Sequence, residues 1–236
     1  MRDQYAGDIS DYLKFAFLRA VAGSDLRLGM AWYYIPVHDG RADGRHTEYL
    51  QQDEWAELDG ELYQNLGQLP EQSVAALERL PIWPKRTLFH RSPISARQRK
   101  PWVDEMAEAL EPVDLVFLDP DNGLGRGPTK HARISDLHAL NQPRRAIAII
   151  KFPGRHQSHE GQIATLHQQL ANDGFFNPIT VCTCVRVPAA NGRTVPRHRF
   201  FTLVNGDETT NTRVQAFSDR VRALHGLVQA NAYCVA

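Results

Sequence analysis

The stretch VDLVFLDPDNG, residues 113–123, decides the fold. Its first six residues are almost wholly apolar and favour β-structure, which predicts a short strand buried on both faces. The five residues that follow, Asp119 to Gly123, are a dense cluster of turn formers. Ligands of an open parallel sheet bind beyond the carboxyl ends of its strands, so we expect a functional site at this junction.

Strand and helix patterns alternate on either side of this stretch. Helical patterns cover residues 8–21, 97–110, 135–140, 158–173 and 212–225, and strand patterns cover residues 26–35, 86–91, 146–152, 179–187 and 198–204. The turn-rich residues 188–196 join the last two strands as a hairpin, whereas the strands at 113–118 and 146–152 each follow a helix. We expect an α/β three-layer sandwich with a mainly parallel sheet and an antiparallel C-terminal hairpin strand.

The chain of 236 residues shows no internal repeat, linker or low-complexity tract. Chains of about 200–250 residues often fold as one α/β domain with a large core. We therefore expect residues 1–236 to form a single domain. Residues 46–82 are rich in Glu, Gln and Leu at helical spacing and predict a helical insertion or cap on it.

Composition excludes several classes of protein. Lys and Arg together number 27, as do Asp and Glu, so the chain lacks the net positive charge of proteins that coat nucleic acids or membrane surfaces. The three cysteines, Cys182, Cys184 and Cys234, are too few and too unevenly spaced for a disulfide framework or a four-ligand zinc site. No apolar run approaches the roughly 18–20 residues that span a bilayer. We expect a cytoplasmic protein with reduced thiols.

Polar residues gather where the two central strands end. Asp119, Asp121 and Asn122 follow the strand at 113–118, and Lys151 ends the strand at 146–152. If these strands are neighbours, Lys151 lies beside Asp119 and can hold a phosphate, a carboxylate or developing charge. The alternatives are a turn whose Asp and Asn bond their own backbone, and a structural Lys–Asp pair. We expect these four residues to be catalytic; Asp119 and Asp121 could also bind Mg²⁺.

Two other segments could bind a ligand. The loop DGRADGR, residues 39–45, offers Asp39, Gly40 and Asp43 to an anionic or nucleoside ligand, or forms two tight solvated turns. Asp8 and Lys14 lie at the start of the first helix, where Asp8 could instead act as a cap.

Histidine and cysteine spacings give weaker signals. His156 and His159 have a spacing that suits metal ligands on a helix, but ten histidines in one chain make such a spacing common by chance. Cys182 and Cys184 share one face of a strand, as small buried side chains or as a redox pair. We expect these histidines and cysteines to hold no metal.

The order of elements and the strand ending in DPDNG resemble the Rossmann-like fold of S-adenosylmethionine-dependent methyltransferases. In that resemblance, the strands at 26–35, 113–118 and 146–152 match the first, fourth and fifth strands, and the hairpin matches the sixth and the reversed seventh. Residues 7–20 (GDISDYLKFAFLRA), 39–45 and 116–124 (VFLDPDNGL) also resemble a family of uncharacterised bacterial proteins with a DPDNG motif.

The resemblance extends to one catalytic motif. In methyltransferases that modify amino groups of nucleic acids, the fourth strand ends in D-P-P-aromatic, whose polar side chain and proline carbonyl accept hydrogen bonds from the target amine. Asp119 and Pro120 match its start, while Asp121 and Asn122 replace the second proline and the aromatic residue. The implied cofactor is S-adenosylmethionine, and the residues we expect near it are Asp39, Gly40, Asp43, Asp8 and Lys14.

Three functions are compatible with these patterns. The first is a methyltransferase-like enzyme acting on a nucleic acid or nucleotide-related substrate. The second is a Mg²⁺-dependent nuclease or phosphodiesterase that uses Asp119, Asp121 and Lys151. The third is a non-catalytic nucleic-acid-binding member of the fold. Its basic face would hold Lys85, Arg86, Arg91, Arg97, Arg99 and Lys100 with Trp83 and Trp102. The alternative is a solvated basic face with two partly buried tryptophans.

Overall fold

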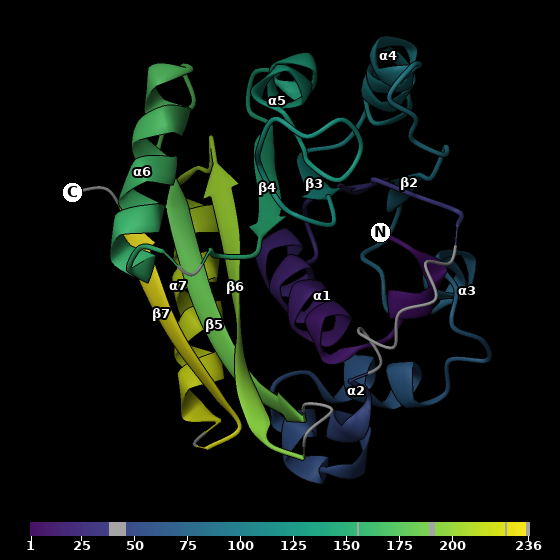
Figure 1. The fold of residues 1–236 in the computed structure, drawn as a ribbon, viewed down its shortest axis with the longest axis vertical. Helices are drawn as coiled ribbons and strands as arrows, with labels where there is room; N and C mark the ends of the chain where they lie inside the picture. Colours follow the sequence, from purple (N-terminus) through teal and green to yellow (C-terminus); the bar gives the residue numbers. More distant parts are fainter. Residues whose placement is uncertain (38–45, 155, 189–191, 225, 235–236) are drawn as a thin grey trace.

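The computed structural model describes residues 1–37, 46–154, 156–188, 192–224 and 226–234 (Figure 1). In this part of the chain, one seven-stranded sheet has the order β2-β1-β3-β4-β6-β5-β7. The strands are β1 (Leu28–Trp32), β2 (Leu88–His90), β3 (Leu115–Asp119), β4 (Ala146–Lys151), β5 (Ile179–Pro188), β6 (Thr194–Val204) and β7 (Val228–Cys234). The first four in spatial order pair in parallel, and the last three continue the sheet through antiparallel pairs.

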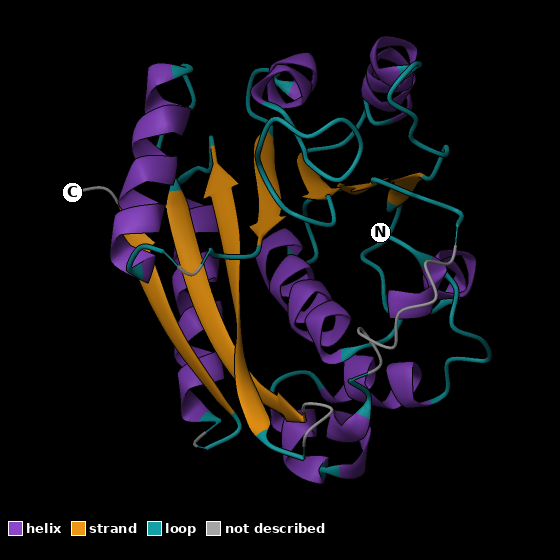
Figure 2. Ribbon diagram, viewed as in Figure 1, coloured by secondary structure: helices purple, strands orange, loops and turns teal. Residues whose placement is uncertain are grey.

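Helices cover both faces of this sheet (Figure 2). They are η1 (Asp3–Tyr5), α1 (Ile9–Ala22), η2 (Glu48–Gln51), η3 (Asp53–Glu57), α2 (Gly60–Gly67), α3 (Val74–Arg79), α4 (Arg99–Ala109), α5 (Ile134–Leu140), α6 (His159–Asn172) and α7 (Glu208–Ala223). Residues of α1 and α7 share an apolar core with one face of the sheet, and residues of α4, α5 and α6 share a second core with the other face. The protein is a three-layered α/β structure.

Each central strand sends alternate side chains into these two cores. In β3, Leu115 and Phe117 belong to the core under α1, whereas Val116 and Leu118 belong to the core under α4 and α5. Coverage on both faces explains why such strands are continuous apolar runs. Asp119 ends β3 in phase with Phe117, so its side chain is directed to the α1 face.

Helix α1 is held tightly against the sheet. Phe17 stacks on Phe201 of β6 and meets Phe217 of α7 edge-on, with ring centroids 5.2 and 5.4 Å apart. Tyr12 lies 5.2 Å from the ring of Tyr49, and its ring meets that of Trp55 at 5.9 Å, so residues 46–82 are attached to α1 by aromatic contacts. These contacts fix the first turns of α1 beside the end of β3.

The expected α/β class, mainly parallel sheet and C-terminal antiparallel hairpin are confirmed. The edge of the sheet differs from the expectation, because the chain continues beyond α7 into β7, which pairs antiparallel with β5. The apolar positions of its alternating pattern are Val228, Ala230 and Ala232, and two alanines give little β signal. No helix in the described part of the chain combines the length and the apolar character needed to cross a membrane.

Candidate active site

The first turn of α1 is built around acidic side chains. Asp8 is the N-cap, and its Oδ1 accepts hydrogen bonds from the N–H groups of Ser10 and Asp11 at 2.8 and 3.1 Å. Asp11 accepts one from the N–H of Gly7 at 2.9 Å. Asp8 therefore does cap the helix, as one of the two sequence interpretations expected, and its charge complements the helix dipole.

Lys14 connects two carboxylates that are far apart in the sequence. Its Nζ lies 2.6 Å from Oδ1 of Asp11 and 3.0 Å from Oδ1 of Asp119. All three residues are at most 4% exposed. Charged side chains are rarely buried to this extent unless they are paired, because taking them out of water is costly. The end of β3 is therefore locked to α1 by a buried ionic triad.

Arg199 of β6 completes the group from the other side. Its Nε donates a hydrogen bond to Oγ of Ser10 at 2.7 Å, and its charge acts on Asp8. We call Asp8, Asp11, Lys14, Asp119 and Arg199 the buried charged group. With every member ionised it holds three carboxylates and two cations, which leaves one surplus negative charge.

The surplus charge is reflected in the pKa values. Burial raises the pKa of Asp11 to about 6, and the repulsion of Asp8 and Asp119 adds to the effect of burial while Lys14 opposes it. Burial raises the pKa of Asp8 too, against the charge of Arg199. Burial alone lowers the pKa of Lys14, but Asp11 and Asp119 more than offset it, so this pKa is raised. Such a group favours uptake of a proton or another cation.

The DPDNG turn lies beside this group. The carboxylate of Asp121 is 2.8 Å from the amino group of Met1, and the N–H of Asn122 donates to the carbonyl of Lys130 at 2.8 Å while its side chain is exposed. Gly123 has φ of +80°, and a Cβ there would lie 2.6 Å from Cα of Lys151. The turn needs glycine at the point where it passes the end of β4.

Lys151 lies on the opposite face of the sheet from Asp119. Its partner across the sheet is Phe200, which packs with Cys182 under α6. Within the described residues Nζ of Lys151 contacts no carboxylate, and burial lowers its pKa. The structure thus brings Asp119 together with Lys14, and Lys151 together with the DPDNG turn, but does not bring Asp119 to Lys151.

The loop candidates Asp39, Gly40 and Asp43 lie outside the described residues. The chain is next described at His46, whose carbonyl accepts a hydrogen bond from the N–H of Ile9 at 3.0 Å. Residue 46, where the described chain resumes, therefore lies next to the first turn of α1.

Sequence reasoning missed Arg199. A charged residue directly before Phe200 and Phe201, in a strand that must be buried, was the available signal, because such a residue needs a partner. It also missed Asp136, which fixes the segment that follows the DPDNG turn. Asp136 accepts hydrogen bonds from the hydroxyl of Tyr33 at 2.8 Å and from the N–H of Arg133 at 2.9 Å, and it pairs with Arg99.

At the basic face around Lys85–Lys100, both tryptophans are at least partly buried, as the alternative interpretation expected. Trp102 is 3% exposed, and the half-buried Trp83 packs against Phe15 with ring centroids 4.8 Å apart. Arg99 is buried against Asp136. Two exposed cations of this face form ion pairs, Arg91 with Glu78 and Lys100 with Asp104.

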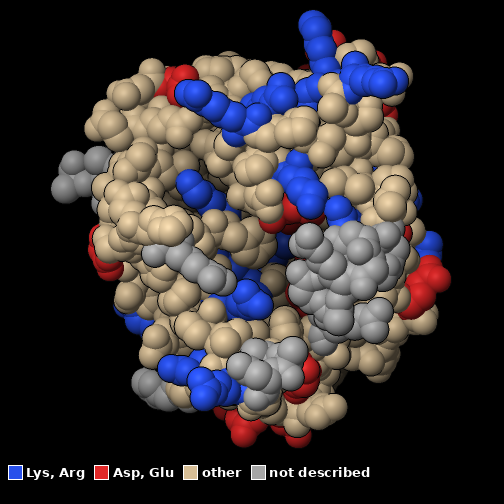
Figure 3. All heavy atoms as spheres, in the orientation of Figure 1, with Lys and Arg blue, Asp and Glu red and all other residues tan. Residues whose placement is uncertain are grey.

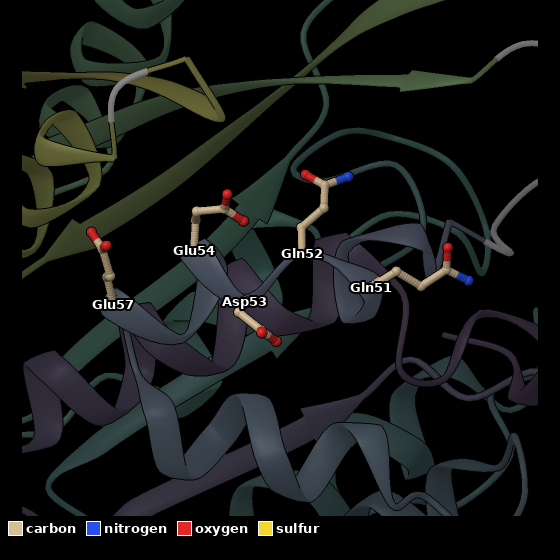
Figure 4. A pocket seen from close by; sticks show the side chains of 5 residues that line it. All are labelled: Gln51, Gln52, Asp53, Glu54 and Glu57. Carbon is tan, nitrogen blue, oxygen red and sulfur yellow. The ribbon is translucent and has the colours of Figure 1, made fainter.

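The hollows on the described surface differ in character. In Figure 3, Lys and Arg side chains gather around a hollow over α1 and the end of β4, while most visible Asp and Glu lie toward the outline of the molecule. Figure 4 shows a second hollow, of about 610 Å³, on η2 and η3. It is lined by Gln51, Gln52, Asp53, Glu54 and Glu57. These side chains point in different directions, so the second hollow has no converging set of groups that could hold a ligand.

Comparisons with known proteins concern the fold alone. No family model matches the chain, and no curated protein matches it. A solved structure of a DUF519-family protein from Legionella pneumophila is similar with a TM-score of 0.46 and 12% identity, covering 97% of this chain and 98% of that chain. A precorrin-8w decarboxylase from Methanobacterium thermoautotrophicum has a TM-score of 0.36 and 10% identity, covering 82% and 89%. A precorrin-6y C5,15-methyltransferase from Geobacter metallireducens has a TM-score of 0.32 and 8% identity, covering 81% of this chain and 87% of that chain.

The resemblance noted in the sequence is supported in part by the strand directions. It implied a reversed strand at the C-terminal end of the sheet, and β6 runs antiparallel to both β4 and β5. The likeness to a bacterial family with a DPDNG motif stays a prediction.

Proposed function

We propose that this protein is a methyltransferase-like enzyme that uses S-adenosylmethionine and acts on a nucleic acid or nucleotide-related substrate. The observation that carries the proposal is the buried charged group at the end of β3. Buried ionisable groups with perturbed pKa values, brought together from distant segments, are typical of functional sites. This edge of an open α/β sheet is also where ligands bind.

The charge of the group suits the cofactor. S-adenosylmethionine supplies an electrophilic methyl group on a sulfonium and carries a net positive charge at neutral pH. The buried charged group has one surplus negative charge when every member is ionised, and burial raises the pKa of Asp11 to about 6. Asp8 and Asp11 are the residues that would hold the positive end of the cofactor, and Lys14 keeps Asp11 and Asp119 in position.

The substrate side of the proposal rests on Asp119 and its neighbours. Lys14 lies 3.0 Å from each carboxylate oxygen of Asp119, which fixes the orientation of this side chain. Asp119 and the carbonyl of Pro120 would accept hydrogen bonds from a target amine, the role implied by the resemblance. The exposed amide of Asn122 can donate and accept. Methyl transfer then depends mainly on the alignment of a nucleophile.

Two surface features favour an anionic, aromatic substrate. Lys and Arg side chains surround the hollow over α1 and the end of β4 (Figure 3). Phe152, directly after β4, is 40% exposed, and an exposed ring can stack on a base. Both features suit a nucleotide, whose phosphate is negative and whose base is flat.

Isothermal titration with S-adenosylmethionine tests the cofactor. We expect the wild-type chain to bind it, and Asp8→Asn to weaken binding at least tenfold. Asp207→Asn is the matched control, because Asp207 caps α7 in the same way, with Oδ1 accepting from the N–H of Thr210 at 2.8 Å. No binding by the wild-type chain at millimolar cofactor would refute the proposal.

Transfer of a labelled methyl group to RNA, DNA or nucleotides tests the substrate. We expect Phe152→Ala to raise KM with little change in kcat, because stacking contributes to binding. Phe176→Ala is the control, since Phe176 is 58% exposed and lies after α6, away from the end of β4. Equal effects of the two variants would contradict a stacking role for Phe152.

The Mg²⁺-dependent nuclease has less support. Its two proposed metal ligands each face a cation instead, Asp119 at Lys14 and Asp121 at the amino group of Met1. A divalent ion would have to displace both partners, so we do not favour this function.

A further inference from the structure

A second cluster of chemically versatile side chains lies away from the buried charged group. His159, Cys182 and His198 each place a ligand atom within 4.8 Å of the other two. They come from three elements, the start of α6, β5 and β6. Figure 1 shows the start of α6 beside these two strands. Neither the number of cysteines nor the spacing of histidines in the sequence can reveal a ligand set that forms across a hairpin.

Cys184 lies beside this cluster. It lies on the same face of β5 as Cys182 and is paired with His198 in the strand register. Its Sγ is 3.6 Å from Nε2 of His198. Cys184 therefore contacts one histidine of the cluster and is a second thiol beside it.

One ring nitrogen of His198 lacks a hydrogen-bond partner among the described residues. This atom, Nδ1, is buried. The ring of His159 lies 4.1 Å from that of His198, centroid to centroid, at an interplanar angle of 58°. Buried polar atoms are nearly always satisfied, so an unpartnered nitrogen in such a cluster points to an absent ligand.

We propose that His159, Cys182 and His198 bind a zinc ion. The side chain of Cys184 would turn from Nε2 of His198 to supply the fourth ligand, which gives a closed Cys₂His₂ set of the structural type. On binding, two Zn–S bonds form and the two thiols release their protons to solvent, while the imidazoles bind as neutral ligands. No oxidant or reductant is involved.

The surroundings explain why two cysteines are needed. His159 is the first residue of α6, whose N-terminus carries the positive end of the helix dipole and disfavours a cation. Zn²⁺ with two thiolates is electrically neutral, whereas Zn²⁺ with one thiolate is positive. The fourth position is therefore better filled by Cys184 than by water.

The ion would act as a clip between the hairpin and α6. Cys182, Phe200 and Lys151 form one row across β5, β6 and β4, so the clip lies next to the end of β4. It would hold the start of α6, residue 159, against β5 and β6, near the chain that leaves Lys151. The proposal is independent of the proposed function, because it concerns other residues and a metal rather than a cofactor.

Titration of the metal-free protein with Co²⁺ under argon tests the ligand set. Thiolate ligation gives a sulfur-to-cobalt charge-transfer band in the near ultraviolet, and four-coordination gives intense visible bands. We expect both bands to reach their plateau at one Co²⁺ per chain and to disappear when Zn²⁺ is added. Wild-type protein without a charge-transfer band at stoichiometric Co²⁺ overturns the proposal, whatever the variants do.

Variants identify the residues. We expect Cys182→Ser and His159→Gln to weaken Zn²⁺ binding about 100-fold, and Cys184→Ser to halve the charge-transfer band and weaken binding. His156→Gln is the matched control, an exposed histidine three residues before His159. Circular dichroism checks that each variant is folded. Equal losses in His156→Gln and His159→Gln, or an unchanged band in Cys182→Ser, would show that these residues do not form the site.

Discussion

Replacing Lys14 with methionine tests the buried charged group most directly. The substitution keeps the length of the side chain but removes the ammonium group that contacts both Asp11 and Asp119. Removing one partner of a buried ion pair costs about 3–5 kcal/mol, because it leaves a buried charge without compensation. Both carboxylate side chains are at most 6% exposed, so we expect a loss of about 4 kcal/mol in the free energy of unfolding at pH 7.5.

The loss should depend on pH. The pKa of Asp11 is raised to about 6 from its ordinary 3.8, so between these values the folded chain binds a proton that the unfolded chain has released. This contribution stabilises the folded chain at low pH and is lost as the pH rises. Without Lys14 the carboxylates repel one another more strongly and the pKa rises further. The deficit of the variant is therefore smallest near pH 4 and largest above pH 7.

Urea unfolding at pH 4.5 and pH 7.5, followed by tryptophan fluorescence, measures this effect. The double variant Lys14→Met with Asp11→Asn should recover part of the stability lost at pH 7.5, because it removes one of the repelling carboxylates. Lys100→Met is the control, since Lys100 forms an exposed pair with Asp104 and should change stability by less than about 0.5 kcal/mol. A deficit below about 1 kcal/mol at pH 7.5, or equal deficits at both pH values, would refute the reasoning.

Three further substitutions probe the site's framework. Gly123→Ala should destabilise the fold by about 1–3 kcal/mol more than Gly174→Ala in the same urea assay, because both glycines have positive φ but only Gly123 would place its Cβ against the backbone of Lys151. Arg99→Met should cost about 3–5 kcal/mol, because it leaves the carboxylate of Asp136 buried with weaker partners, whereas its neighbour Lys100→Met should cost almost nothing. As the pH rises from 4 to 6, the wild type should lose free energy of unfolding relative to Asp11→Asn, because Asp11 loses its proton. A difference that stays constant over this range would show that Asp11 does not bind the extra proton.

The strands were predictable where apolar residues form continuous runs. The sequence LVFLD gives β3, and AIAIIK gives β4, because strands covered on both faces need apolar side chains at every position. The same reasoning failed at β7, whose face toward the core of α1 and α7 is lined largely by alanines. Pattern recognition depends on the size of the buried side chains, and small residues leave a weak pattern.

The position of Asp119 was predictable, but its partner was not. Any residue that directly follows a central strand lies at the edge of the sheet where ligands bind. Which face it points to depends on register, because a shift of one residue exchanges the faces. Leu118 pairs with Ile149 across β3 and β4, so Lys151, two residues beyond Ile149, points away from Asp119. The sequence left open whether the two strands are neighbours, and it could not show which face of the sheet each side chain occupies.

The direction of β6 explains the remaining omissions. A parallel strand contributes to the functional edge only through the loop that follows it, which is where the sequence was searched. Because β6 is antiparallel to β4, the first half of β6 itself reaches that edge, and Phe200 stands opposite Lys151. Adjacent residues of β6 then serve opposite faces: Arg199 reaches Ser10 at the start of α1, and His198 meets His159 at the start of α6. A reversed strand in such a sheet can therefore place functional side chains within the strand itself. Its first residues are candidate site residues in the same way as the loops that follow its parallel neighbours.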